Sequence, residues 1–209
     1  MSSAIRDAGL TLIELLRDSL VADPPTDDRP IASRDHIALL SPRDVNQNRD
    51  VRLTLFLYSI TPSVELRNEL EIPGNRNSDQ PASEPLDLYY LLTAFAPATQ
   101  DPTEQTLDAQ LLLGFAMRVL FDNGILTGSV LKGNLPRDEE LRLTLQPMTV
   151  EDLTRIWSVF PDSVLHASVS FVVSPVQLLS TRARGGHRVV ARQSDVDRMT
   201  PINAEGAVA

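Results

Sequence analysis

The stretch PLDLYYLLTAFAP, Pro85 to Pro97, constrains the fold more than any other part of the chain. Its alternate residues divide into two faces, and both faces are largely apolar. A strand of this kind is typical of the interior of a sheet that is covered on both sides. The sequence therefore predicts a central strand that ends at Pro97. Because Tyr89 and Tyr90 point to opposite faces, at most one of them is expected to be deeply packed.

Four other segments show strand patterns. Alternation is clearest in VRLTLFLYSI, where Val51, Leu53, Leu55 and Leu57 share one face. ELRLTLQPM alternates in the same way, and a short strand is expected over His36–Leu40. In VLHASVSFVVSPVQLL the odd-numbered residues Leu165 to Val173 are expected to face inward, with His166, Ser168 and Ser170 outward.

Three segments have helical patterns and capping residues. Ser2 or Ser3 can cap a first helix, which ends before the proline-bearing run at 23–28. Asp101 and Pro102 open a second helix, and Thr149 opens a third, VEDLTRIWSVF, whose apolar face includes Val150 and Trp157. Between Leu111 and Phe121 the only charge is Arg118, so the pattern predicts a helix with most faces buried. Asn123-Gly124 predicts a left-handed stop.

This order of elements favours an α+β fold: a mixed, mostly antiparallel sheet of about five strands, with about three helices packed on one face. Residues 1–181 are predicted to form one domain. Residues 71–85 are predicted to be a mobile loop and residues 182–209 a flexible C-terminal arm, because both are polar and poor in apolar side chains.

The charge balance limits the classes of partner. The net charge is −9, whereas residues 182–209 carry five arginines and three acids. An acidic body argues against nucleic-acid binding. Charged residues interrupt the N-terminal helix pattern, so it is no signal peptide, and no window approaches the ~20 apolar residues of a membrane span. With no cysteine in the chain, a cytoplasmic location is expected.

No group of residues predicts catalysis. His36, His166 and His187 lie in separate segments without metal-ligand spacing. In GSVLKGN, Lys132 precedes Gly133, so the order of a phosphate-binding loop is not met. The acid run 138–140 is expected to be solvated. We therefore predict no catalytic, cofactor-binding or metal-binding residues and no cofactor. Arg118 is expected to pair with an acid or to extend to the surface, with a subunit contact as the alternative.

Three stretches together resemble a known family: PLDLYYLLTAFAP, LLLGFAMRVLFDNGILTG, and LRLTLQPMTVEDLTRIWSVFPDSVLHASVSFVVSPVQLL. HIALLSPRDV and VRLTLFLYSITP precede them in the same order. Residues 4 to 180 thus resemble the N-terminal domain of the tail terminator, or cap, proteins of extracellular contractile injection systems. These systems are phage-tail-like particles with an inner tube, a contractile sheath and a baseplate.

The resemblance implies a structural protein without catalytic residues. It implies a ring, expected to be a homo-hexamer, that ends tube and sheath polymerisation at the end distal to the baseplate and joins the two. The implied partners are copies of the chain and the tube and sheath proteins, with the protein incorporated into the particle. The alternatives are another tail-completion or adaptor protein of such a particle, a small enzyme, or a binding module. Residues 182–209, and also 71–85, are hypothesised to be arms that join neighbouring subunits.

Overall fold

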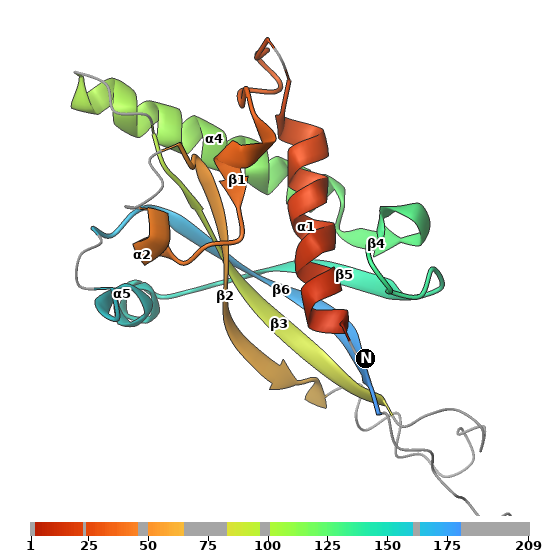
Figure 1. Cartoon of the computed structure of the whole chain (residues 1–209). Helices are drawn as coiled ribbons and strands as arrows, with labels where there is room; N and C mark the ends of the chain where they lie inside the picture. The colour runs from red at the N-terminus through yellow and green to blue at the C-terminus, as the bar shows by residue number, and fades with distance from the viewer. Residues whose placement is uncertain are drawn as a thin grey trace, which may run out of the picture.

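The computed structural model describes residues 3–22, 24–45, 50–64, 83–96, 101–160 and 164–180. Within these ranges the helices are α1 (Ala4–Leu20), α2 (Pro42–Val45), α4 (Pro102–Asp122) and α5 (Val150–Ser158), with 3-10 turns η1 (Arg34–His36) and η2 (Gly128–Val130). The strands are β1 (Ile37–Ala38), β2 (Leu53–Pro62), β3 (Ser83–Ala94), β4 (Ile125–Thr127), β5 (Glu140–Gln146) and β6 (Ser168–Leu179). They form one sheet in the order β1-β2-β3-β6-β5-β4 (Figure 1). Only β1 and β2 pair in parallel, so the predicted α+β class with a mixed, mostly antiparallel sheet is confirmed.

The strand β3 lies at the centre of the sheet, as its two apolar faces predict. It pairs with β2 on one side and with β6 on the other along most of its length. Tyr90 is only 1% exposed and stacks on Phe171, its partner in β6, whereas Tyr89 is half-buried on the opposite face. The prediction that one tyrosine at most is deeply packed is therefore confirmed.

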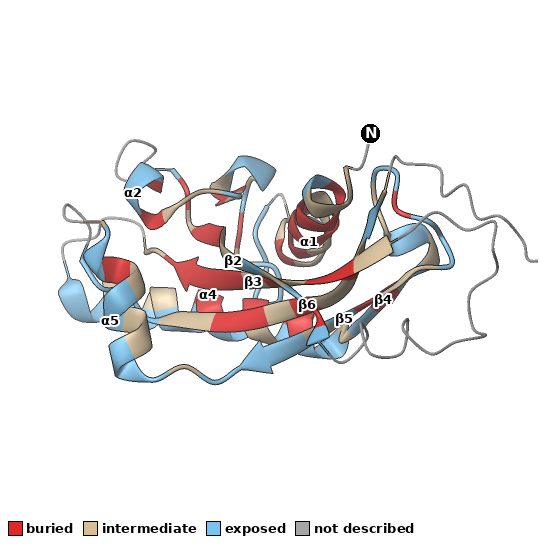
Figure 2. Cartoon of the chain, turned by 90° about the horizontal axis from the view of Figure 1, so that it is seen from below, coloured by how far each residue is buried: buried red, intermediate tan, exposed pale blue. Residues whose placement is uncertain are grey.

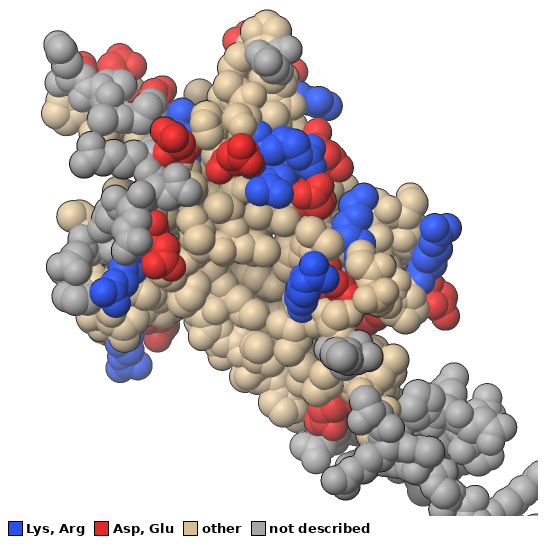
Figure 3. Space-filling view, viewed as in Figure 1, with Lys and Arg blue, Asp and Glu red and all other residues tan. Residues whose placement is uncertain are grey.

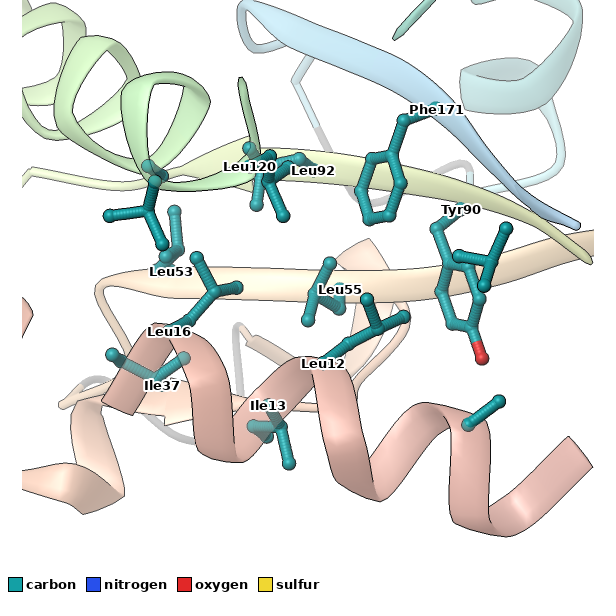
Figure 4. Packing of buried hydrophobic residues seen from close by; sticks show 14 of the residues in the cluster. Leu12, Ile13, Leu16, Ile37, Leu53, Leu55, Tyr90, Leu92, Leu120 and Phe171 are labelled. Atoms are coloured by element: carbon teal, nitrogen blue, oxygen red, sulfur yellow. The ribbon is translucent and has the colours of Figure 1, made fainter. Parts of the chain in front are cut away.

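The main core lies between α1 and the sheet. Leu12 and Leu16 of α1 are fully buried, and they meet the β2 side chains that alternate inward, Leu53 and Leu55 (Figure 4). The inner side of α4 joins the same cluster through residues including Leu120. Each fully buried leucine contributes about 1.5–3 kcal/mol relative to exposure. The core thus joins the first helix to strands that come much later in the sequence.

The helix α5 packs against the other face of the sheet. Phe160, just after α5, meets Phe56 edge-on with ring centroids 5.6 Å apart, and Phe56 alternates in β2 with the core residue Leu55. Figure 2 shows α5 at one end of the sheet, apart from α1. The expectation of helices on one face alone is therefore wrong. The second face carries its own apolar side chains, and burying them requires a cover of its own.

The ends of several elements differ from the sequence prediction. The strand expected over His36–Leu40 is reduced to two residues, since His36 belongs to η1. Residues 125–127 form an additional strand, β4, which the glycines of this region concealed in the sequence. The predicted left-handed stop at Gly124 is wrong: α4 ends at Asp122, and its C-cap residue Asn123 donates from both its backbone and side-chain N–H groups to the carbonyl of Val119.

Residues 83–85 belong to β3, so the predicted loop over 71–85 extends too far. The rest of that loop, and the predicted arm at 182–209, lie outside the described residues.

Several other burial predictions are wrong. Val150, predicted on the apolar face of α5, is 75% exposed, because as the first residue of the helix it precedes the packed turn around Trp157. In the last strand, Leu165 is 51% exposed and precedes β6, whereas Ser170 is buried. The hydroxyl of Ser170 is satisfied there by Tyr58, which allows a polar side chain in a covered position.

Candidate subunit-contact surfaces

The histidines are not brought together in the described structure. His36 ends η1, whereas His166 is an exposed residue whose ring contacts those of Phe95 and Trp157, at centroid distances of 4.8 and 5.7 Å. Desolvation of part of the imidazole lowers the pKa of His166, so the neutral imidazole is favoured. His187 lies outside the described residues. The two described histidines are thus parts of separate structural contacts.

The loop containing Lys132-Gly133-Asn134 contacts a carboxylate of the same chain, that of Asp7. The buried carboxylate of Asp7 in α1 accepts a hydrogen bond from the backbone N–H of Asn134 at 3.0 Å. The N–H of Lys132 donates to the hydroxyl of Thr11 at 2.9 Å. Gly133 has a positive φ of 71°. Backbone N–H groups that converge in such turns favour anions, and here Asp7 takes that position.

The acidic residues singled out in the sequence have structural contacts as well. Glu139 accepts a hydrogen bond from the N–H of Gln177 at 3.1 Å, and its pKa is raised mainly by burial. Glu140 pairs with Arg142 in the same strand. Asp152 and Thr149 form the capping box of α5, as their spacing predicts. These acids stabilise local structure.

The described residues contain neither a metal-binding cluster nor a membrane-spanning helix. No group of three or more His, Asp or Glu side chains there is arranged to hold a metal ion. None of the described helices combines the length and the apolarity that crossing a membrane requires.

The outer side of α4 is the most unusual exposed surface. Leu107, Leu111, Gly114, Arg118 and Phe121 follow one another at alternating intervals of four and three residues, so they lie along one line of the helix. We name these five residues the α4 stripe. Leu107, Leu111 and Phe121 are 52%, 57% and 78% exposed. The prediction that most faces of this helix are buried is therefore wrong.

The reason is the position of α4 relative to the sheet. The buried residues of the helix begin only at Leu112, and its N-terminal half extends beyond the strands (Figure 1). Leu107 and Leu111 therefore cannot pack into the core and stay exposed. The sequence already indicated an exposed apolar face, because a helix that is apolar on all sides cannot bury all of them in a single core.

Gly114 lies at the middle of the α4 stripe. Apart from Gly114 itself, its two neighbours in the chain and the adjoining helix backbone, no described atom lies within 4 Å of the point where a Cβ would stand. Glycine in the interior of a helix costs roughly 0.5–1 kcal/mol relative to alanine. The described fold gives no packing reason for this glycine, whereas a close contact from outside would give one.

Arg118 is the only basic residue of the stripe. Its guanidinium lies 3.6 Å from the carboxylate of Asp28 and 4.9 Å from the ring centre of Phe115. Both members of the ion pair are more than half exposed, so solvent screens the pair strongly. The expectation that Arg118 pairs with an acid at the surface is confirmed.

A second candidate surface is the face of the sheet opposite to α1. The hydroxyls of Tyr58 and Ser170 are 2.8 Å apart, across the intervening strand β3. The hydroxyls of Thr93 and Ser168 are also 2.8 Å apart. Beyond α5 this face is uncharged over Tyr58, Tyr89 and Val172, which are all half-buried and combine apolar surface with tyrosine hydroxyls. Such a surface suits a protein contact.

Charged side chains are distributed around these surfaces. Figure 3 shows basic and acidic groups together over the upper part of α1, where Arg34 pairs with Glu14 and Asp18. The neighbouring area of that view is largely uncharged. Arg34, Glu14 and Asp18 therefore form an ion-paired cluster beside the uncharged area.

The fold and these surfaces define an α+β module whose exposed features suit contacts with other proteins. Residues 8–192 match the family model described as the Pvc16 N-terminal domain. Since the match spans most of the sequence, the chain belongs to this family. No curated protein sequence matches the chain.

Two solved structures share the fold. The sheath/tube terminator of the PVC extracellular contractile injection system, in its extended state, matches with 19% identity and a TM-score of 0.57. The match covers 95% of this chain and 65% of that one. The tube-terminating cap of the anti-feeding prophage matches with 14% identity, a TM-score of 0.51, and coverages of 90% and 60%. The chain thus spans less than two thirds of the length of either protein.

Proposed function

We propose that the protein is a structural cap of a contractile injection system. In this role it ends polymerisation of tube and sheath at the end distal to the baseplate, joins the two, and has no enzymatic activity. The observation that carries the proposal is membership of the Pvc16 N-terminal domain family over residues 8–192. The two structural neighbours, which are a sheath/tube terminator and a tube-terminating cap, support it.

The arrangement of the surfaces suits this role. A cap must match the last ring of the particle on one side and refuse another ring on the other. Ring formation uses heterologous contacts that close by rotation, so each subunit needs two different contact surfaces. The polar sheet face is one candidate for a contact between copies, and the exposed α4 stripe is a separate surface that can contact the rest of the particle. A homo-hexamer, assembled in the cytoplasm and incorporated into the particle, is the form that we propose.

Negative-stain imaging tests the proposal. The purified protein should form six-fold rings, and particles assembled with it should carry one ring at the end without the baseplate. Particles assembled without it should show tubes and sheaths of uncontrolled length. A monomer that is absent from purified particles, together with unchanged particle length, would reject the proposal.

Residues 182–209 form a separate part of the proposal. Their role as an arm between subunits is a prediction, supported by five arginines in a chain of net charge −9. Deleting 182–209 should weaken the ring while leaving the unfolding of the domain unchanged. Rings of equal stability with and without these residues would reject the arm, and the cap function would stand.

A further inference from the structure

We propose that the α4 stripe is the docking site for a helix of a second protein, apolar along one side and lined beside that side by lysine or arginine. The proposal rests on the cap function, since the second protein is taken to be a subunit of the particle. It adds what the comparisons leave open: which surface makes the contact and which chemistry recognises it.

The apolar part of the stripe fixes the kind of contact. Leu107, Leu111 and Phe121 extend along about four turns of helix and are each more than half exposed. An amphipathic helix that lies along such a line places its own apolar side chains between them, as in helix-in-groove recognition. A partner of this length would bury the three side chains together, and large buried anchors supply most of the binding energy of an interface.

Gly114 fixes the closest approach. It stands between Leu111 and Phe121, and the position of its missing side chain is open space among the described residues. Helices cross closely where a small residue faces the partner, because interaxial distance depends on the side chains at the contact. A docked helix would therefore cross α4 at Gly114, with leucines on one side of the crossing and Phe121 on the other.

The charges beside the stripe fix the partner's composition. Glu104 and Asp122 are both exposed, and neither forms an ion pair with a described residue. They lie seven residues before and eleven after Leu111, roughly two and three helical turns, so they share its side of the helix. Asp28 balances Arg118. The two unpaired acids give the stripe an acidic margin.

This margin argues for a different protein as the occupant. Residues 1–181 of a second copy carry a net charge of −11 (−9 for the chain less +2 for 182–209), so its folded domain would bring like charges together, which costs free energy at an interface. A helix with basic residues beside its apolar side would pair with Glu104 and Asp122 instead. Such pairing at the rim directs the partner to the correct orientation and makes the contact sensitive to salt.

The test uses the full-length protein and tube–sheath particles. The particles are assembled from the cognate tube and sheath proteins without this protein. Gly114→Leu fills the open space and improves helix propensity, so its Tm should rise by about 2–4 °C. Its binding to the particles should nevertheless fall by at least about tenfold. Leu111→Gln, which removes an anchor without filling the crossing, should also bind more weakly. Binding of the wild-type protein should decrease as NaCl concentration rises.

Val164→Gln is the matched control, since Val164 is 76% exposed but lies outside α4. It should bind as the wild type does. If Gly114→Leu and Leu111→Gln both bind like the wild type, the stripe is not the docking site, although the cap function stands. If the wild type itself does not bind, the cap function fails and this proposal fails with it. If either variant instead abolishes self-association of the free protein in light scattering, the occupant is a second copy and the proposal is wrong.

Discussion

The carboxylate of Asp7 and the backbone N–H of Asn134 form a hydrogen bond of 3.0 Å between residues that are 127 positions apart in the sequence. The hydroxyl of Ser3 also donates to this carboxylate, and Arg6 lies 3.2 Å from it. The bond holds the loop that precedes β5 against the first turns of α1. The N-terminal helix is therefore held to the β5 side of the sheet by a polar contact as well as by packing in the core.

Replacing Gly133 with alanine tests this contact. A Cβ at Gly133 would stand 2.3 Å from Cγ of Asp7, and the φ of 71° also disfavours a side chain. We expect Gly133→Ala to lower the free energy of unfolding, measured in urea, by about 1–3 kcal/mol or more. Gly128→Ala is the control, since its φ is 63° but a Cβ there meets open space. Equal losses in both variants would show that backbone strain alone is responsible.

The stability of the protein should also depend on pH through Asp7. The Ser3 hydroxyl bond is the largest influence on its carboxyl group and, with the Asn134 N–H, lowers its pKa below the ordinary value of 3.8, while burial opposes the shift. The folded state therefore binds this proton less readily than the unfolded chain. Stability supplied by Asp7 is complete above about pH 4 and is lost as pH falls through the folded pKa.

Asp7→Asn isolates this effect, because asparagine keeps the shape but does not titrate. Urea unfolding of both proteins at several acidic pH values should show the advantage of the wild type shrinking as pH decreases. A constant difference between the two curves would contradict the assignment to Asp7.

A second pH effect, below pH 6.5, is expected from His166. The rings of Phe95 and Trp157 desolvate part of the imidazole and lower its pKa below 6.5, so the unfolded chain takes up the proton first as pH falls. The stability from this packing is present above about pH 6.5 and is lost as pH falls through the folded pKa.

Trp157 is the only tryptophan in the chain, so its fluorescence reports this packing. A fluorescence transition below pH 6.5 is expected, and His166→Phe should remove it. His36→Gln should leave the transition unchanged; if it abolishes the transition, His166 is not the titrating group.

The hydrogen bond between Tyr58 and Ser170 should be measurable in a double-mutant cycle. Ser170 is 2% exposed and its hydroxyl lies 2.8 Å from that of Tyr58. Tyr58→Phe, Ser170→Ala and the double variant should give a coupling of about 1 kcal/mol in urea unfolding. Strictly additive losses would mean that the contact contributes nothing to the stability of this face.

Local patterns predicted much of this fold from the sequence. The two apolar faces of PLDLYYLLTAFAP identified the central strand, and the capping residues Thr149 and Asp152 identified the start of α5. These signals depend on neighbours in the sequence, so they survive without tertiary information. The family resemblance, which agrees with the match over residues 8–192, supplied the rest of the functional hypothesis.

Features that depend on distant contacts could not be predicted in this way. The length of β1 depends on which of its residues can pair with β2. The close packing at Gly133 depends on Asp7, which belongs to α1. The exposure of Leu107 and Leu111 depends on how far the sheet extends beneath α4. In each case the residue type was visible, but the element it would meet was not.

The packing of α1 against β6 has a consequence for the timing of folding. The ladder between β3 and β6 cannot be completed until residue 179 has been synthesised, and the core contacts of α1 with β6 also require that strand. Contacts between such distant parts of a chain form slowly, and domains generally fold as units as they emerge from the ribosome. Nascent chains on a polysome therefore lack a finished core until β6 emerges, and a truncated translation product that stops before β6 cannot compete with the complete protein for its binding partners.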